Sequence, residues 1–410
     1  VDWQTTPKTG NFTAANGEGY FVNTTSGAIT MTMPSGSAGA IVSIQDYNKT
    51  FDDNNFTINP ASGEKINGGT ADGPLNISTE GQGLTFVYVD STVGWKTIHE
   101  NEFTGGGSSF ISATGGTITN TPTCRIHTFT GPGTFQVTSV AACSANNAVG
   151  YLVVAGGGGG SGGPSGDGGG GGGAGGFREG RTNPITPYTA SPLVTTGHTV
   201  SVQSYPITVG GGGGGTNSFQ TPGSQGNQSV FSSFTSTGGG GGGGNTTAAT
   251  SGGSGGGGGA GGGGPHPGNS GNTPPVSPPQ GNNGGEGGTT GTPGTDQRGG
   301  GGGGATAVGQ PSQPSDKGGD GGAGGTTHIT GSPVAYAGGG GGMSSPSNTS
   351  ADGAGGTGGG GAGAACGSAA VAGTTNTGGG GGGAGGSISP APSTGANGGS
   401  GIVIIRYKIA

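Results

Sequence analysis

The stretch YLVVAGGGGGSGGPSGDGGGGGGAGGFREG, residues 151–180, joins a strand-like apolar run to an almost pure glycine tract. The opening YLVVA is typical of a buried β-strand. The glycine that follows is interrupted by a short polar segment, resumes, and ends at Phe177. Glycine-rich and serine-rich segments commonly form flexible linkers. The question is therefore whether this tract is a flexible linker or an ordered structure that only glycine can form.

Composition excludes one conventional hydrophobic core along the whole chain. Glycine accounts for 115 of 410 residues, about 28 %, whereas about 7 % is usual. Hydrophobic residues make up 26 % and charged residues 7 %. The formal net charge is −7 and no basic run occurs, which argues against nucleic-acid binding. No apolar run is long enough to span a bilayer, so we expect no membrane insertion.

Residues 1–102 have the composition of an ordinary β-domain. Short runs rich in β-branched and aromatic residues, such as GYFVN, AITMTM, AIVSIQDY and LTFVYVD, are separated by Gly, Asn, Asp and Ser turns. Strands at such short, regular spacing are typical of a sandwich or a jelly roll. We therefore predict an N-terminal β-sandwich, jelly-roll-like, over 1–102.

The sequence of residues 103–155 predicts a linker followed by a small β-unit. NEFTGGGSSF, residues 101–110, is typical of a hinge. RIHTFTGPGTFQVTSV, residues 125–140, predicts a hairpin that turns at Gly-Pro-Gly. Cys124 and Cys143 flank this hairpin and either form a disulfide or remain small buried thiols. The three cysteines show no CxxC spacing, which argues against a zinc site.

From residue 156 onward the glycine tracts have two different ends. Several follow an apolar, strand-like run, namely YLVVA, YPITV, VFSSFTST and SPVAYA. Several give way to a polar segment, namely SGGPSGD, TNSFQTPGSQGNQ, NTTAATS, MSSPSNTSAD and SISPAPST. The tracts thus have one apolar end and one polar end.

Packing decides between a linker and an ordered structure. Ordering a glycine costs roughly 0.5–1 kcal/mol beyond alanine, and a hydrogen bond returns on the order of 0.5–1.5 kcal/mol, so one isolated tract stays disordered. Polyproline-II helices of glycine can instead pack closely and bond one another, because no side chain separates them. We therefore predict an all-β plus polyglycine-II fold. Packed glycine-rich helices occupy 156–410 and are closed by a strand at 402–408.

These blocks resemble the glycine-rich domain of tail- and head-fibre proteins of marine tailed bacteriophages. The likeness rests on YLVVAGGGGG, GGAGGFREG, YPITVGGGGGG, SVFSSFTSTGGGGGGG, SPVAYAGGGGG and the terminal GGSGIVIIRYKI. The arrangement is also similar to the polyglycine-II sandwich of T-even phage tail-fibre tip adhesins. The opening VDWQTTPKTGNFTAANGEGYFVN resembles a β-domain found upstream in marine phage structural proteins. The resemblance implies a virion location, contact with other virion proteins through the N-terminal domain, and a homo-oligomer, trimers being usual for such fibres.

In those adhesins the glycine helices form a stalk, and the loops at its distal end bind a receptor on the bacterial surface. The receptor expected here is a glycan or an outer-membrane protein. The same plan implies eight receptor-binding loop candidates: Pro164, Asp167, Phe219, Gln220, Thr247, Met343, Ser345 and Asn348. Exposed aromatic and methionine side chains on such loops would supply contact area. The alternative for each residue is an inert solvent loop.

The sequence carries no motif that indicates catalysis, a cofactor or a metal. Matches to GxGxxG arise by chance at this glycine content and lack the strand–helix context. A polysaccharide depolymerase needs paired carboxylates in a cleft, whereas the 18 acidic residues are thinly spread. We therefore expect a non-enzymatic virion fibre protein that recognises a host surface. The alternatives are a purely structural capsid or tail decoration or filament-forming subunit, and, second, a depolymerase.

Overall fold

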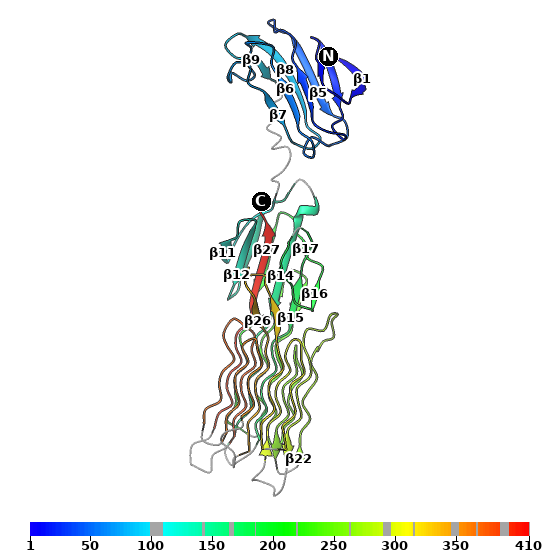
Figure 1. Ribbon diagram of the computed structural model, residues 1–410. Helices are drawn as coiled ribbons and strands as arrows, with labels where there is room; N and C mark the ends of the chain where they lie inside the picture. Colours follow the sequence, from blue (N-terminus) through cyan, green and yellow to red (C-terminus); the bar gives the residue numbers. More distant parts are fainter. Residues whose placement is uncertain are drawn as a thin grey trace. The chain divides into compact units, whose positions relative to one another are not determined.

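The computed structural model divides into two compact units, Val1–Gly105 and Gly106–Ala410 (Figure 1). It describes residues 1–98, 110–141, 144–163, 168–184, 186–218, 220–261, 264–289, 297–314, 316–345, 352–365, 368–385 and 393–409. Among these residues every regular element is a β-strand, apart from one 3-10 turn, η1 (Ser144–Asn147). The predicted all-β class is therefore confirmed.

The first unit is built from two sheets. One has the strand order β1-β3-β5-β8-β9 and the other has the order β2-β4-β6-β7. The strands are β1 (Asp2–Lys8), β2 (Phe12–Thr13), β3 (Glu18–Val22), β4 (Ile29–Thr32), β5 (Ile41–Asp46), β6 (Phe56–Asn59), β7 (Leu75–Ile77), β8 (Gly83–Asp90) and β9 (Gly94–Thr97). Both sheets contribute side chains to one core, which includes Phe86 from the first and Phe56 from the second.

The first six strands of this unit alternate between the two sheets. β1, β3 and β5 are parallel neighbours in one sheet, and β2, β4 and β6 are parallel neighbours in the other. Antiparallel pairs arise only where β7, β8 and β9 join. The chain therefore winds from sheet to sheet rather than folding back on itself as a jelly roll does. Each connection from β1 to β6 therefore crosses from one sheet to the other.

The core of the first unit is aromatic and its polar atoms are paired. Phe51 and Phe56 stack with ring centroids 5.1 Å apart. Trp95 is fully buried, and its indole Nε1 donates to the Glu64 carboxylate at 2.9 Å. A buried indole needs such an acceptor because its N–H is otherwise unsatisfied.

The second unit begins with two further sheets, in the orders β10-β13-β18-β19-β20 and β11-β12-β27-β14-β15-β16, with β17 paired to β14. The strands are β10 (Ser112–Thr114), β11 (Thr117–Asn120), β12 (Cys124–Phe129), β13 (Gly133–Ser139), β14 (Ala148–Val154), β15 (Phe177–Gly180), β16 (Val194–Thr195), β17 (His198–Thr199), β18 (Ser204–Thr208), β19 (Ser229–Phe231), β20 (Phe234–Ser236) and β27 (Ile402–Lys408). The short pairs are β21 (Ala260–Gly261) with β22 (Gly264–Pro265), β23 (Gly288–Thr289) with β24 (Gln297–Arg298), and β25 (Gly325–Thr327) with β26 (Val334–Tyr336).

The C-terminal strand β27 occupies the residues that the sequence predicted and lies inside its sheet, between β12 and β14. Both of its faces are covered. Ile405 packs in a core with Phe135 and Tyr151, whereas Ile404 packs in a second core with Leu152 and Phe177. Side chains alternate across a strand, so one strand closes two cores.

Two predictions for residues 103–155 are wrong. β12 and β13 do not pair with each other, because β12 is held by β11 and β27, and β13 by β10 and β18. The Gly-Pro-Gly segment therefore connects two sheets instead of closing a hairpin. These strands also do not form a unit of their own, since they share sheets with strands of the glycine-rich region.

The glycine tracts pack side by side and run away from the sheets (Figure 1). We call the tracts between residues 155 and 401 the glycine array, its end at the sheets the proximal end, and the opposite end the distal end. Amides three residues apart donate to the same neighbouring segment. In the tract 156–161, residues 156 and 159 donate to Asn227 and Ser224, residues 157 and 160 to Gly399 and Ala396, and residues 158 and 161 to Gly173 and Gly170. The hydrogen bonds of this tract therefore repeat every three residues, which is the period that a polyproline-II-type helix would have.

The same tract has six neighbours in all. Its carbonyls accept from three more segments, through the amides of Gly239 and Gly242, Gly213 and Thr216, and Gly381 and Ala384. A Cβ on Gly158 would lie 2.1 Å from the carbonyl oxygen of Gly240. No side chain fits at that distance, so the packing itself requires glycine. Backbone hydrogen bonds on all sides replace the hydrophobic core that the composition lacks.

Two groups of β12 are buried in the sandwich of the second unit. Cys124 is a buried free cysteine, and Cys143, its suggested disulfide partner, lies outside the described residues. His127 is fully buried, with Nδ1 2.6 Å from the Gly115 carbonyl and Nε2 3.1 Å from the Tyr407 hydroxyl. These partners suit the neutral ring, in which Nδ1 donates and Nε2 accepts.

Stability of the second unit is expected to fall as the pH drops below about 6.5, the ordinary pKa of histidine. Burial lowers the pKa of His127, and it lowers the pKa of His198 as well. The unfolded chain then binds protons that the folded chain resists, so the stabilisation is complete above pH 6.5 and is lost below it. Denaturant titrations at pH 7.5 and 5.5 measure this loss. The variant His127→Gln/His198→Gln should show a smaller loss; an unchanged loss would contradict the assignment to these histidines.

Candidate recognition surface at the distal end of the array

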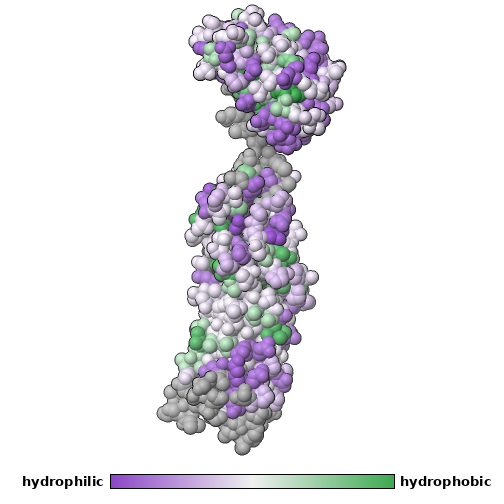
Figure 2. Space-filling model, viewed as in Figure 1, coloured by the Kyte–Doolittle hydropathy of each residue, from purple (hydrophilic) through white to green (hydrophobic). Residues whose placement is uncertain are grey.

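The ends of several tracts meet at the distal end of the array. Isolated bridges join Gly163 to Ser393, Ala364 to Ala384, and Gly168 to both Ala260 and Gly385. The apolar runs that precede the tracts lie at the other end, where they form β14, β18, β19, β20 and β26. The described ends of these tracts are therefore gathered at one end of the array, and Figure 2 shows a hydrophilic patch over the distal part of this unit.

Four of the eight predicted loop residues, Pro164, Asp167, Phe219 and Asn348, lie outside the described residues. Gln220 is exposed, and its backbone amide donates to Ser218 Oγ at 3.2 Å. A contact of 3.0 Å between the hydroxyls of Thr216 and Thr221 closes this loop. The amide of Thr216 donates to the Gly160 carbonyl, which places the loop at the distal end.

Thr247 is half-buried in the segment that follows the tract 238–244. Its carbonyl accepts from the Gly244 amide at 3.0 Å. Its hydroxyl is buried and has no hydrogen-bond partner among the residues that the structure describes. A Cβ on Gly261 would meet the neighbouring Asn245 side chain, so this turn also belongs to the distal end.

Met343 and Ser345 do not supply exposed contact surface, contrary to expectation. Both residues are fully buried. The amide of Met343 donates to the Gly169 carbonyl at 3.1 Å, and that of Ser345 donates to the Asp316 carbonyl at 3.0 Å. These two residues continue the packed tract 338–342. The prediction was wrong because their segment, MSSPSNTSAD, has the polar composition of a solvent loop.

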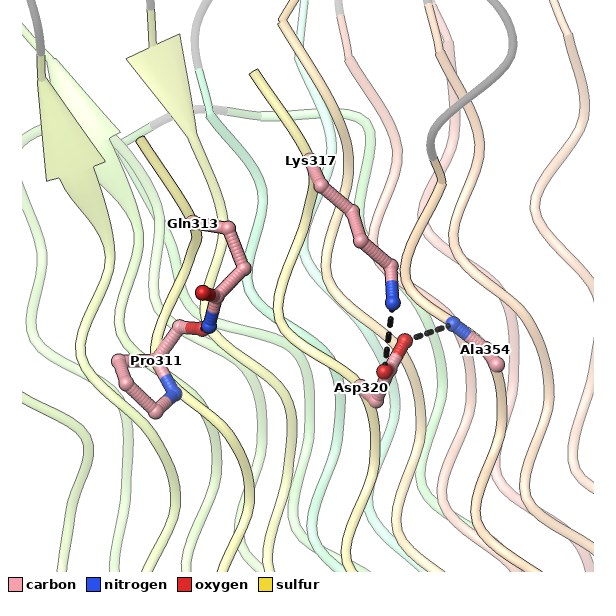
Figure 3. Close-up of polar contacts among 5 residues, drawn as sticks. All are labelled: Pro311, Gln313, Lys317, Asp320 and Ala354. Atoms are coloured by element: carbon pink, nitrogen blue, oxygen red, sulfur yellow. Dashed lines mark hydrogen bonds and ion pairs between the residues drawn. The ribbon is translucent and has the colours of Figure 1, made fainter. Parts of the chain in front are cut away.

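The distal end also carries a cluster of charged residues that the sequence-based prediction did not include. Figure 3 shows Lys317 and Asp320, whose Nζ and Oδ2 lie 2.6 Å apart. The other oxygen of Asp320, Oδ1, accepts from the Ala354 amide at 2.8 Å. Beside them, Arg298 forms an ion pair of 3.0 Å with Asp316. The signal was present as SDKGGD (315–320), a charged run in a chain that has few charges.

These charges connect neighbouring tracts at the point where the polar segments leave the array. Lys317 and Asp320 remain about one-third exposed, whereas the Arg298 side chain is only 3 % exposed. Exposed ion pairs contribute little to stability, about 0–1 kcal/mol. Gln313, which donates from Nε2 to the Pro311 carbonyl at 3.0 Å, adds an amide to the same surface (Figure 3). The cluster therefore offers hydrogen-bonding and charged groups to a ligand.

A second group of buried charged residues lies at the proximal end, where Glu179 and Arg406 contact other residues of the chain. The Glu179 carboxylate accepts from the Ser191 amide at 2.8 Å and from the Thr327 hydroxyl. Arg406 donates to the Ile329 carbonyl at 3.1 Å and lies over the Tyr188 ring. Burial raises the pKa of the Tyr188 hydroxyl. These contacts hold loops against the sheet.

The described residues contain no group of three or more His, Cys, Asp or Glu side chains that could hold a metal ion. A cavity of about 150 Å³ in the first unit is lined by residues 66, 67, 69, 70 and 73–75. None of these is acidic, so this cavity does not supply the paired carboxylates that a depolymerase needs. Within the described parts of the chain, no helix is long and apolar enough to cross a membrane.

Open sheets and a packed array of glycine tracts define an all-β, glycine-rich protein. The chain belongs to the glycine-rich domain family, whose model matches residues 128–408. The match begins near the end of β12 and includes the later strands of both sheets of the second unit, the whole array and β27. A search of curated proteins found no match to this chain.

Proposed function

We propose that this protein is a virion fibre protein of a tailed bacteriophage, in which the glycine array displays loops that recognise the surface of a host cell. The observation that carries the proposal is the polarity of the array. Apolar runs enter the sheets at the proximal end, whereas polar and charged segments leave the tracts at the distal end. The N-terminal unit is proposed to attach the fibre to other virion proteins.

The physics of the array suits this task. Each interior tract is bonded to neighbouring tracts and carries few side chains, most of them small, such as Ala174 and Ser254, so the array is a stiff support. Loops at its distal end can change without disturbing the packing, because they lie outside the glycine segments. The exposed amide of Gln220 and the partly exposed side chains of Gln313 and Lys317 suit a glycan or protein surface that is rich in hydrogen-bonding groups.

Binding of the labelled full chain to a panel of marine bacteria tests the proposal, with isolated surface polysaccharide and outer-membrane vesicles as separate probes. We expect saturable binding to particular strains. The variant Gln220→Ala/Gln313→Ala should weaken that binding by about tenfold, since a few residues dominate most interfaces. The matched control Gln203→Ala/Gln228→Ala changes exposed glutamines near the sheets and should leave it unchanged.

Other outcomes would favour the alternatives. Absence of binding to any strain, or equal affinity of both variants, would point to a structural decoration or filament subunit. Release of reducing sugar ends from the bound polysaccharide would point to a depolymerase. Only a loss confined to the distal variant supports recognition through the array loops.

A further inference from the structure

Two border segments of the array share a pattern: a side chain stands where the segment faces solvent, and glycine stands where it faces another tract. In the segment 223–228, Ser224 and Asn227 are exposed, whereas Gly223 is buried. The same holds in the segment 281–287, where Asn283 and Glu286 are exposed and Gly285 is buried. Side chains on the solvent side lower the entropy cost of ordering, because glycine is the most costly residue to order.

The tract 210–215 departs from this pattern. Gly211, Gly212 and Gly214 are exposed, and they are the only exposed glycines in the described tracts of the array. Gly212 is required within the chain, because its Cβ would lie 1.9 Å from the Gly398 carbonyl oxygen. A Cβ on Gly211 would meet only Asn227 Nδ2 at 3.7 Å, and one on Gly214 only Ser224 Oγ at 3.9 Å. Neither residue has a positive φ, so nothing among the described residues requires glycine at these two positions.

The backbone of this tract is also only partly bonded. The carbonyls of Gly211 and Gly214 accept from the segment 224–227, and the amide of Gly213 donates to Gly157. In contrast, the carbonyls of Gly212 and Gly215 and the amides of Gly211 and Gly214 have no hydrogen-bond partner among the described residues. The tract therefore presents both donors and acceptors along an open edge, as an edge strand does in a sheet.

The interior of the array shows which neighbour is missing. A Cβ on Gly156 or Gly159 would strike the carbonyl oxygen of Gly211 or Gly214, at 2.0 and 2.1 Å. The tract that blocks these positions also donates to the carbonyls one residue further on, at 157 and 160. A segment that donates to the carbonyl of one residue thus covers the Cβ position of the residue before it. A segment that donated to the free carbonyls of Gly212 and Gly215 would in the same way cover Gly211 and Gly214. That contact would explain why both residues are glycine.

We propose that this open edge, Gly211–Gly215, is an interface with a second copy of this chain. The partner must bring two free amides three residues apart on a segment without side chains. The open edge itself carries such amides, at Gly211 and Gly214, so one copy can donate to the next. The other border tracts carry exposed side chains, such as Asn283, Val308 and Val371, which prevent this close approach. The interface does not depend on the proposed receptor.

The oligomeric state of the full chain tests this interface. Light scattering across a wide range of protein concentrations should show self-association of the natural protein. The variant Gly211→Ala/Gly214→Ala should be monomeric and its fold no less stable, because among the described residues the added methyl groups make only ordinary contacts of 3.7 and 3.9 Å. The control Gln225→Ala changes an exposed residue on the neighbouring segment and should still associate.

Two results would overturn the proposal: a natural protein that is monomeric at every concentration, or a double-alanine variant that associates as before. Hydrogen exchange gives a measurement that does not depend on the folding of a variant. In the natural protein, the amides of Gly211 and Gly214 should exchange more slowly as concentration rises. Exchange that is fast and independent of concentration would equally reject the interface.

Discussion

Replacing Gly172 by alanine is expected to lower the free energy of unfolding of the second unit by about 3 kcal/mol or more. The new Cβ would lie 2.1 Å from the carbonyl oxygen of Gly158. That obstacle is backbone, so it cannot turn aside as a side chain would. The amide of Gly172 donates to Gly381 at 2.8 Å, and its carbonyl accepts from Gly340 at 2.9 Å. Moving any of these segments breaks bonds in several tracts at once.

Thermal unfolding and hydrogen exchange of the full chain measure this effect. The matched control is Gly214→Ala, studied at low protein concentration. There the Cβ would make only an ordinary contact, 3.9 Å from Ser224 Oγ, and alanine reduces the entropy of the unfolded chain, so the change should be neutral or stabilising by about 0.4–1 kcal/mol. Equal losses in the two variants would contradict the steric explanation of the glycine tracts.

Deleting the C-terminal strand, residues 402–410, is expected to abolish folding of the second unit. Ile402, Val403, Ile404, Ile405 and Tyr407 are all buried. Each such side chain contributes about 1.5–3 kcal/mol on burial, so the loss rivals the whole stability of a typical domain, about 5–15 kcal/mol. Removal also leaves the inner edges of β12 and β14 without a partner.

The two-unit organisation gives this deletion an internal reference. Limited proteolysis should degrade the glycine-rich unit and leave a resistant fragment close to Val1–Gly105. The point variant Lys408→Ala, at the half-buried end of the same strand, should keep both units resistant. Protected array amides in the deleted protein would contradict the view that β27 closes the fold.

Local patterns determined much of this protein. Runs of β-branched and aromatic residues marked most of the longer strands. The terminal strand lies at the predicted residues 402–408, because a short aliphatic run that follows glycine must be buried and strongly favours a strand. The tract ends also followed from the sequence, since apolar runs must be buried and polar segments need water. The depletion of side chains likewise indicated that any order in the tracts must come from backbone bonds.

Pairing was decided only by the tertiary structure. The sequence around Gly-Pro-Gly favoured a hairpin of β12 with β13, but β12 instead pairs with β27, with His127 opposite Ile405. Similarly, MSSPSNTSAD suggested a solvent loop, yet Met343 and Ser345 are buried. Strand and tract partners depend on contacts between residues far apart in sequence. Glycine tracts of nearly identical composition carry no local signal of which neighbour they will meet, so only the complete packing assigns it.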